Sequence, residues 1–187
     1  MPYPAPEHSK RIYTGEILNV HTWDQTLFDG STHLFECVVR QDSANIIPFL
    51  DKDTVLLTKQ EQPGRPTFID VPGGRIETGE DPQNAALREL REESGYHAQA
   101  HLLWSHKLHT GMIRFEEYLF LGGALTPVDQ HLDPGERIET ITVSWKELVQ
   151  LCLENKLRQP HVMLAILCME FNQPDRKRLQ NFLERLP

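Results

Sequence analysis

The segment of residues 74–96 constrains this chain most, because it combines a well-delimited helix with an unusual cluster of carboxylates. Asp81 followed by Pro82 is a typical N-cap and first helical residue, and Gly95 is a typical helix end. The sequence therefore predicts a helix over residues 82–94. The i, i+3, i+4 spacing of helices places three carboxylates on one face of it: Glu89, Glu92 and Glu93.

These carboxylates need a compensating charge. Like charges at this spacing destabilise an isolated helix by about 0.2–0.5 kcal/mol per pair. Arg88 can pair with Glu92 four residues later, but Glu80 adds a further negative charge ahead of the helix. Mg²⁺ prefers carboxylate oxygens and is commonly shared with substrate phosphates. The cluster therefore indicates a Mg²⁺ site, with Mn²⁺ as an alternative metal.

A solvated acidic helix face is the other interpretation, and it is the usual fate of a charge run. The residues ahead of the helix favour the metal site. Gly73 and Gly74 follow a predicted strand and permit a tight loop whose backbone oxygens face the helix. Gly79 allows a second bend before Glu80.

The remainder of the chain mixes strands and helices without a regular βαβ alternation, which predicts an α+β fold. Alternating or apolar runs predict strands at residues 11–19, 34–40, 45–50, 54–58, 67–71, 101–108, 115–121 and 141–144. Helical patterns cover residues 145–155, 160–171 and 175–186. We expect residues 1–42 to form a small antiparallel β extension and residues 43–187 to form the main domain.

Composition narrows the classes of partner. The net charge of −8 argues against nucleic acid, because backbone phosphates are bound mainly by Lys and Arg. No apolar run approaches the ~20 residues of a membrane-spanning helix, and the first residues carry no signal sequence, so we expect no membrane and a cytoplasmic location. The three cysteines form no CxxC pair and are expected to be reduced core thiols. An acidic chain needs metal ions or local basic groups to hold a phosphate substrate.

Residues 74–96 resemble the Nudix signature, G-x5-E-x7-R-E-U-x-E-E-x-G-U, where U is a bulky apolar residue. Tyr96 stands at the last position, where an aliphatic residue is commoner. The other matching residues are Gly74, Glu80, Arg88, Glu89, Leu90, Glu92, Glu93 and Gly95, all in register. The resemblance implies a metal-dependent hydrolase of diphosphate linkages. It also implies the Nudix fold, an α/β/α sandwich with a mixed sheet.

The resemblance also implies roles for the matched residues. Glu92 would lie close to the metal, and Arg88 would orient the glutamates. Metal ions in such a site neutralise the charge on the diphosphate and activate a water for in-line attack. The implied metal ligands are the Gly73 carbonyl, Glu80, Glu89 and Glu93.

In many Nudix subgroups a general base lies outside the signature, on a later loop. Residues 133–139 are the candidate loop here. We favour Glu136, because the chain before the strand at residues 141–144 resembles the base-bearing loop of ADP-ribose pyrophosphatases. Asp133 and Glu139 are the rivals, and an ordinary surface loop is the alternative.

The flanks, over roughly residues 10–171, resemble ADP-ribose and nucleoside diphosphate sugar pyrophosphatases. Asp70 stands where those enzymes usually have Glu, and Gln62 where they often have Arg, although Arg65 is near enough to substitute. We therefore expect all three to contact substrate. The expected substrate is ADP-ribose or a related nucleoside diphosphate sugar, cleaved to a nucleoside monophosphate and a sugar phosphate.

Two aromatic residues of the extension, Trp23 and Phe28, could stack on the base across a subunit boundary, because this subgroup often forms homodimers through the N-terminal sheet. Core packing of both is the alternative. Other substrates compatible with the signature are dinucleoside polyphosphates and nucleoside triphosphates. A non-catalytic nucleotide-binding Nudix module is a third interpretation, which the intact glutamates disfavour.

Overall fold

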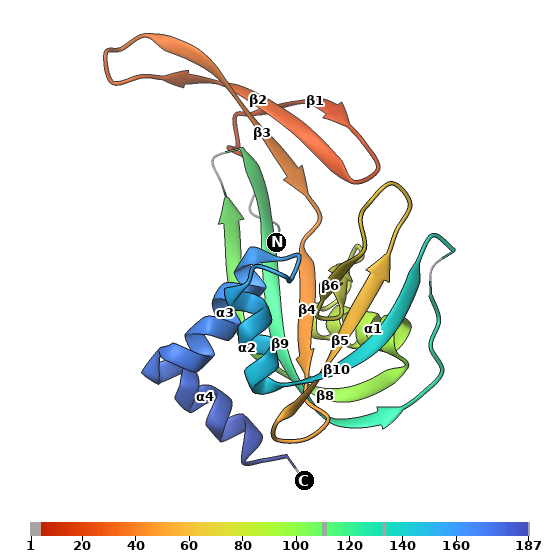
Figure 1. Cartoon of the computed structure of the whole chain (residues 1–187). Helices are drawn as coiled ribbons and strands as arrows, with labels where there is room; N and C mark the ends of the chain where they lie inside the picture. Colours follow the sequence, from red (N-terminus) through yellow and green to blue (C-terminus); the bar gives the residue numbers. More distant parts are fainter. Residues whose placement is uncertain (1–4, 110–111, 133, 187) are drawn as a thin grey trace.

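The structure is a computed structural model that describes residues 5–109, 112–132 and 134–186 (Figure 1). Its strands are β1 (Lys10–Thr14), β2 (Leu18–Thr26), β3 (Thr32–Arg40), β4 (Ser43–Pro48), β5 (Thr54–Glu61), β6 (Phe68–Asp70), β7 (Gly73–Arg75), β8 (Tyr96–His109), β9 (Ile113–Pro127) and β10 (Arg137–Ser144). Its helices are α1 (Pro82–Ser94), α2 (Trp145–Leu153), α3 (Pro160–Phe171) and α4 (Gln173–Leu183).

The strands form two sheets. A seven-stranded sheet has the order β1-β2-β3-β9-β4-β7, with β8 paired to β9, and a three-stranded sheet has the order β10-β5-β6. In the larger sheet β9 runs parallel to β4 and antiparallel to β8. This confirms the predicted mixed sheet.

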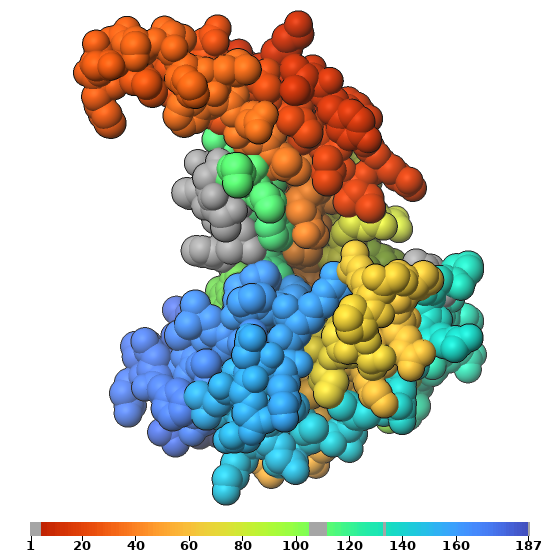
Figure 2. Space-filling view, turned by 45° about the horizontal axis from the view of Figure 1, so that its top comes forward, coloured from red at the N-terminus to blue at the C-terminus, as the bar shows by residue number. Residues whose placement is uncertain are grey.

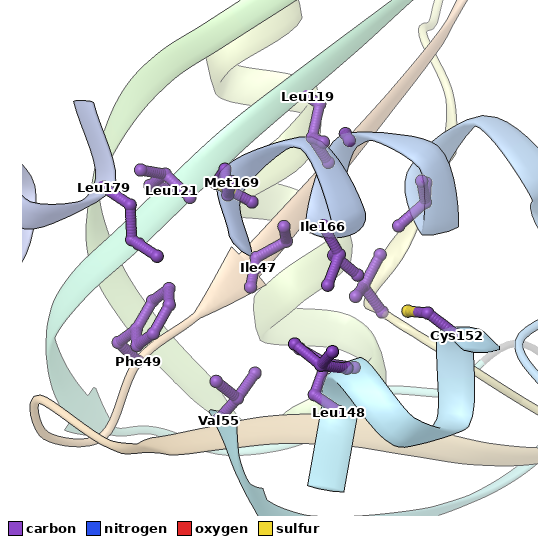
Figure 3. Close-up of a cluster of buried hydrophobic side chains, with 14 of the residues drawn as sticks. Ile47, Phe49, Val55, Leu119, Leu121, Leu148, Cys152, Ile166, Met169 and Leu179 are labelled. Atoms are coloured by element: carbon purple, nitrogen blue, oxygen red, sulfur yellow. The ribbon is translucent and has the colours of Figure 1, made fainter. Parts of the chain in front are cut away.

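Strand β4 lies at the centre of the sandwich, because all six of its residues are buried. Side chains alternate between the faces of a strand. Ala44 and Ile46 therefore pack with Leu90 of α1, whereas Ile47 joins the core beneath α2, α3 and α4. Figure 3 shows this second core, where Ile47 and Phe49 are clustered with Leu148 of α2, Ile166 of α3 and Leu179 of α4. Each fully buried aliphatic side chain contributes about 1.5–3 kcal/mol, so the two clusters fix the helices on opposite faces.

Helix α1 begins and ends at the predicted residues. The Asp81 carboxylate accepts hydrogen bonds from the backbone N–H groups of Gln83 (2.9 Å) and Asn84 (3.3 Å). Gly95 adopts a left-handed conformation with φ of 70°, and its N–H donates to the Arg91 carbonyl at 2.9 Å. Both ends are thus satisfied by the residues that predicted them.

The N-terminal extension differs from the prediction in two respects. The single strand predicted over residues 11–19 is wrong, because the chain turns between β1 and β2, with the Gly15 N–H donating to the Leu18 carbonyl at 2.9 Å. A Cβ at Gly15 would lie 3.0 Å from the Leu18 carbonyl oxygen, so a larger residue would crowd this turn. The extension is also continuous with the main sheet, because β3 pairs with β9 at Val38 and Val39. Figures 1 and 2 show it as an arm that stands out from the body.

The boundary expected between residues 42 and 43 falls in the short link between β3 and β4. The candidate loop over residues 133–139 ends earlier than expected, because β10 already begins at Arg137, which pairs with Glu61 of β5. All three cysteines are free, and Cys37 and Cys152 are buried. In the part of the chain that the structure describes, no helix has both the length and the apolar character needed to cross a membrane.

Candidate active site

A cleft of about 850 Å³ opens where β7, α1, β5, the start of α3 and the loop before β10 meet. Nine of the residues selected from the sequence line it: Gln62, Arg65, Asp70, Gly73, Arg88, Glu89, Glu92, Glu93 and Glu136. Glu80 does not line the cleft itself, but it is joined to it through Arg88. The structure therefore brings together residues from five separate elements and loops.

Arg88 is the centre of a dense network on α1. Its guanidinium donates to Glu80 (2.9 and 3.1 Å), Glu89 (2.9 Å), Glu92 (2.9 Å) and the Arg75 carbonyl (3.0 Å). These contacts, with that to Glu80 the largest contribution, raise the pKa of Arg88 above its ordinary value. One guanidinium carries one positive charge, so three carboxylates remain under-neutralised. The orienting role expected of Arg88 stays a prediction, and these contacts are the observation that supports it.

Two carboxylates of the cluster, Glu89 and Glu93, are short of positive charge. Glu93 is 4% exposed and accepts hydrogen bonds from Gln60 Nε2 (3.0 Å) and the Gly73 N–H (3.1 Å). Burial, together with the negative charges of Glu89 and Glu136, raises the pKa of Glu93 well above its ordinary value. Burial likewise raises the pKa of Glu89 to about 7, against the opposing effect of Arg88. A buried carboxylate in this situation is stabilised by taking up a proton or a cation.

The backbone of β7 approaches this pair closely because it is built from glycine. A Cβ at Gly74 would lie 2.6 Å from the carboxylate carbon of Glu89, and one at Gly73 would lie 2.7 Å from the Ala44 carbonyl oxygen. Gly73 also pairs in register with Asn45 of β4, which fixes its position along the strand. A side chain at Gly73 would clash with backbone atoms, whereas one at Gly74 would displace the Glu89 carboxylate.

The donor set of this region fits a hard divalent cation. Every candidate ligand atom is an oxygen of a carboxylate or of a backbone carbonyl, and Mg²⁺ prefers such ligands. Structural zinc sites, in contrast, are typically built from Cys sulfur and His nitrogen atoms. Among the described residues, no three Asp, Glu, His or Cys side chains already converge as a preformed ligand group. Arg88 instead holds Glu80, Glu89 and Glu92 on its own guanidinium.

Glu136 faces the glutamates across the cleft. Its negative charge contributes to the raised pKa of both Glu89 and Glu93. Gln62 Nε2 donates to its Oε1 at 3.4 Å, and Arg65 in turn donates to Gln62 Oε1 at 3.4 Å. Three residues selected from the sequence thus form one chain of contacts along the rim of the cleft.

The rivals of Glu136 are placed differently. The side chain of Glu139 is 70% exposed, lies outside the cleft, and forms an ion pair with Lys59 at 3.7 Å. Asp133 lies outside the described residues.

Asp70 lies at the end of β6 and is 2% exposed. Its carboxylate accepts a hydrogen bond from the Val71 N–H at 3.0 Å, and burial raises the pKa of Asp70 to about 7. Asp70 is therefore an acidic group in the floor of the cleft, whereas Arg65 is an exposed group at its rim.

Neither Trp23 nor Phe28 lines the cleft of its own chain. Trp23 is 7% exposed, because its place in β2 turns it inward, where it packs 5.9 Å from Phe35 and beneath the Arg114 guanidinium. Phe28 is fully exposed in the turn between β2 and β3. Stacking of these residues on a base thus stays a prediction that requires a second chain.

Sequence reasoning missed the other side of the cleft. Arg40 lies over the Phe115 ring at 4.4 Å, and Arg158 lies over the Phe68 ring at 4.6 Å. Further lining residues that were not selected are Asn45, Gln60, Glu117, Gln159 and His161. The sequence contained one signal for this side of the cleft. Glu116 and Glu117 are adjacent carboxylates within the apolar run of residues 115–121, which is unusual for a buried strand.

Comparison with known proteins gives three findings. A family model described as the NUDIX domain matches residues 39–165. Over 169 residues, which are 88% of this chain and 91% of each relative, the chain is 25% identical to the ADP-ribose pyrophosphatase of Bacillus subtilis (strain 168) and 24% identical to the methanol dehydrogenase activator of Bacillus methanolicus. A crystal structure of an ADP compounds hydrolase superposes with a TM-score of 0.75 at 17% identity, covering 97% of this chain and 94% of that one. The similarity of structure confirms the predicted fold.

Proposed function

Because the chain belongs to the NUDIX domain family, we propose that it hydrolyses the diphosphate linkage of ADP-ribose or a related nucleoside diphosphate sugar. The products are a nucleoside monophosphate and a sugar phosphate. One observation carries the proposal: the buried Glu93 and the mostly buried Glu89 lie on α1 against glycine backbone, short of positive charge, in a cleft of about 850 Å³. A cleft of this size accommodates a nucleotide. The similarity to an ADP-ribose pyrophosphatase over most of both chains supports the choice of substrate.

In this proposal residues 43–187 are the hydrolase domain and residues 1–42 are an extension to it. Glu89, Glu93, Glu80 and the Gly73 carbonyl hold Mg²⁺, for which Mn²⁺ can substitute. When bound, the cation neutralises charge on the diphosphate and makes the attacking water more acidic. Arg88 keeps the glutamates oriented, and Glu92 adds negative charge beside them.

The general base lies on the opposite rim of the cleft. Water forms a bond to one phosphorus as the bond from that phosphorus to the bridging oxygen breaks, and Glu136 accepts the proton that the water releases. Gln62 orients Glu136 through the contact to Oε1. Arg65 is placed to bind a phosphate oxygen, because its side chain is exposed at the rim and its partner there is the uncharged Gln62.

We further propose that the chain forms a homodimer through its extension. Apolar side chains on this arm are unusually exposed: Ile12 is 57% exposed, Tyr13 56%, Ile17 52% and Leu34 62%. All four belong to the same arm, and exposed apolar patches mark interaction sites. In the dimer Phe28 stacks on the base in the partner's cleft, with Trp23 behind it in the arm. A monomer in light scattering at micromolar concentration would contradict this arrangement.

A substrate panel with Mg²⁺ tests the activity. It contains ADP-ribose, UDP-glucose, GDP-mannose, a dinucleoside polyphosphate and dGTP. We expect turnover of ADP-ribose or of another nucleotide sugar. Hydrolysis of only the last two compounds would replace the sugar assignment by the polyphosphate alternative, and hydrolysis of none would favour a non-catalytic module.

A further inference from the structure

A second buried polar cluster lies in the floor of the cleft, and the mechanism above does not use it. We call it the Glu117 cluster; its members are Asn45 of β4, Glu117 of β9, and Gln159 and His161 at the start of α3. Glu117 Oε1 accepts from Asn45 Nδ2 at 2.7 Å, and Oε2 is in contact with His161 Nε2. Gln159 closes the ring, with its Nε2 donating to Asn45 Oδ1 at 2.8 Å and its Oε1 lying 3.2 Å from His161 Nε2.

This cluster is costly as a purely structural device. Glu117 is 1% exposed, and a buried carboxylate is expensive unless it is paired and hydrogen-bonded. Well-packed apolar residues of similar volume often stabilise a protein as well as a buried ion pair does. The ring of side chains nevertheless lines the cleft instead of filling the core. A role towards a ligand would account for its position.

His161 is the member that can meet a ligand. Its side chain is 25% exposed, and its Nε2 faces both Glu117 and Gln159. Because Nε2 faces a carboxylate, it carries the proton, and Nδ1 is then a hydrogen-bond acceptor in the neutral ring. Within the described part of the chain, Nδ1 has no protein partner. Glu117 therefore fixes both the tautomer and the direction of the imidazole.

Three arginines line the same side of the cleft: Arg40, Arg75 and Arg158. They lie close enough to interact, because the charges of Arg75 and Arg158 add to burial in lowering the pKa of Arg40, while Glu117 opposes them. None of the three forms a salt bridge with a carboxylate among the residues that the structure describes. This side of the cleft therefore offers guanidinium donors above a hydrogen-bond acceptor.

We propose that this side of the cleft is the subsite for the sugar-phosphate half of the substrate, with His161 Nδ1 accepting a hydrogen bond from a sugar hydroxyl and Arg40 and Arg158 binding the phosphate. The inference rests on the proposed hydrolysis of nucleotide sugars, and it names the residues that distinguish a sugar phosphate from a bare phosphate. Glu117 is a positioning residue, because it acts through His161.

A sugar phosphate fits this subsite better than a nucleobase does. A base needs an open aromatic or apolar face for stacking. The two aromatic rings that line this side, Phe68 and Phe115, each have a guanidinium over one face already. Hydroxyl and phosphate groups, in contrast, match the acceptor and the donors present.

Direct binding tests the subsite without turnover. Titration calorimetry in the absence of divalent metal compares ribose 5-phosphate with inorganic phosphate, so that the sugar is the only difference. We expect the unmodified chain to bind ribose 5-phosphate about tenfold more tightly, as one or two additional hydrogen bonds allow. His161→Gln can keep the contact with Glu117 through its amide nitrogen but loses the Nδ1 acceptor. It should bind ribose 5-phosphate roughly 5- to 10-fold more weakly, with unchanged affinity for phosphate.

The matched control is His101→Gln, because His101 lies on β8 edge-on to Phe182 at 5.5 Å, outside the cleft. It should bind both ligands as the unmodified chain does. Arg158→Gln changes an exposed side chain and should weaken both ligands by a similar factor. Thermal unfolding of each variant verifies that it is folded; should His161→Gln not fold, Arg158→Gln and the comparison of ligands on the unmodified chain still decide.

The proposal is overturned if the unmodified chain binds ribose 5-phosphate no more tightly than phosphate. It is also overturned if folded His161→Gln keeps the full preference, or if Arg158→Gln binds both ligands normally. Turnover of ADP-ribose with Mg²⁺ is measured separately on the unmodified chain. A failure there rejects the proposed function, whereas the binding results decide the subsite.

Discussion

The two sides of the cleft are assembled in opposite ways. The acidic side consists of Glu80, Glu89, Glu92 and Glu93 around Arg88, and every hydrogen bond from Arg88 to a glutamate spans eight residues or fewer. The basic side consists of Arg40, Arg75 and Arg158 beside the Glu117 cluster, two of whose hydrogen bonds span 72 residues from Asn45 to Glu117 and 114 from Gln159 to Asn45. Short-range spacing can be read from a helix period, whereas long-range pairing depends on sheet order.

The two sides also have complementary deficits of charge. Burial raises the pKa of Glu89 and that of Glu93, so both are stabilised by binding a proton or a cation. On the basic side, the described salt bridges include none from a carboxylate to Arg40, Arg75 or Arg158. A diphosphate with a divalent cation satisfies both deficits at once. The comparison therefore predicts that changes on the acidic side abolish turnover and that changes on the basic side alter affinity.

The largest expected effect is that of Glu93→Gln. It removes the most buried carboxylate of the acidic side but retains a similar shape, so the fold should persist. Loss of several kcal/mol of transition-state stabilisation predicts a fall in kcat of roughly 1,000-fold. Steady-state turnover of ADP-ribose with Mg²⁺ measures it, beside Glu184→Gln at an exposed position at the end of α4. Retention of activity within tenfold would contradict the assignment of Glu93 as a metal ligand.

The next largest effect is expected from Arg88→Met, and it is a loss of stability. The Arg88 side chain is 22% exposed and has three carboxylate partners, which would be left without their cation. Removing one partner of a buried ion pair costs about 3–5 kcal/mol, and partial exposure lowers the expected loss to about 2–4 kcal/mol. Urea unfolding without metal measures it, and added Mg²⁺ should restore part of the loss.

The matched control for Arg88→Met is Arg91→Met, since Arg91 is 51% exposed and its contact with Glu92 is 4.0 Å long. Its free energy of unfolding should change by no more than about 0.5 kcal/mol. Equal losses from the two substitutions would show that the network around Arg88 has no special role.

Glu136→Gln tests the rim that joins the two sides. Removal of a general base predicts a loss in kcat of about 100-fold with a small change in KM. Glu139→Gln is the control, because that carboxylate is 70% exposed and pairs with Lys59 outside the cleft. A larger loss from Glu139→Gln than from Glu136→Gln would exchange their roles.

The contrast between the sides also explains what the sequence could predict. Asp81, Pro82 and Gly95 determined the bounds of α1, because capping depends on neighbouring residues only. The apolar runs located β4 and β9, because buried strands are mostly apolar, although Asn45 and Glu117 interrupt them.

The turn at Gly15 and the pairing of β3 with β9 were not foreseen, since both depend on contacts that no local pattern specifies. For the same reason Arg40, Glu117 and His161 were missed, although they lie in the same cleft as residues that were selected. Trp23 and Phe28 show the converse, because aromatic character alone did not place them in this cleft.

The smallest expected effect is a dependence of stability on pH. The pKa of Glu89 and that of Asp70 are both raised by burial to about 7 in the folded chain. Unfolding returns them to about 4, so the folded chain binds more protons between these values. The metal-free protein should therefore lose stability as pH rises from about 5 to 8, and its Tm should fall over the same interval.

Two variants separate the contributions to this slope. Glu89→Gln should reduce the slope and also the stabilisation by Mg²⁺, which in the unmodified chain is larger at pH 8 than at pH 5.5 because protons compete with the cation. Asp70→Asn should reduce the slope but keep the response to Mg²⁺, because Asp70 bonds the Val71 N–H and is not one of the proposed ligands. Calorimetric Tm values with and without Mg²⁺ measure both. If Asp70→Asn abolished the Mg²⁺ response and Glu89→Gln kept it, the cation would be held in the floor of the cleft and not on α1.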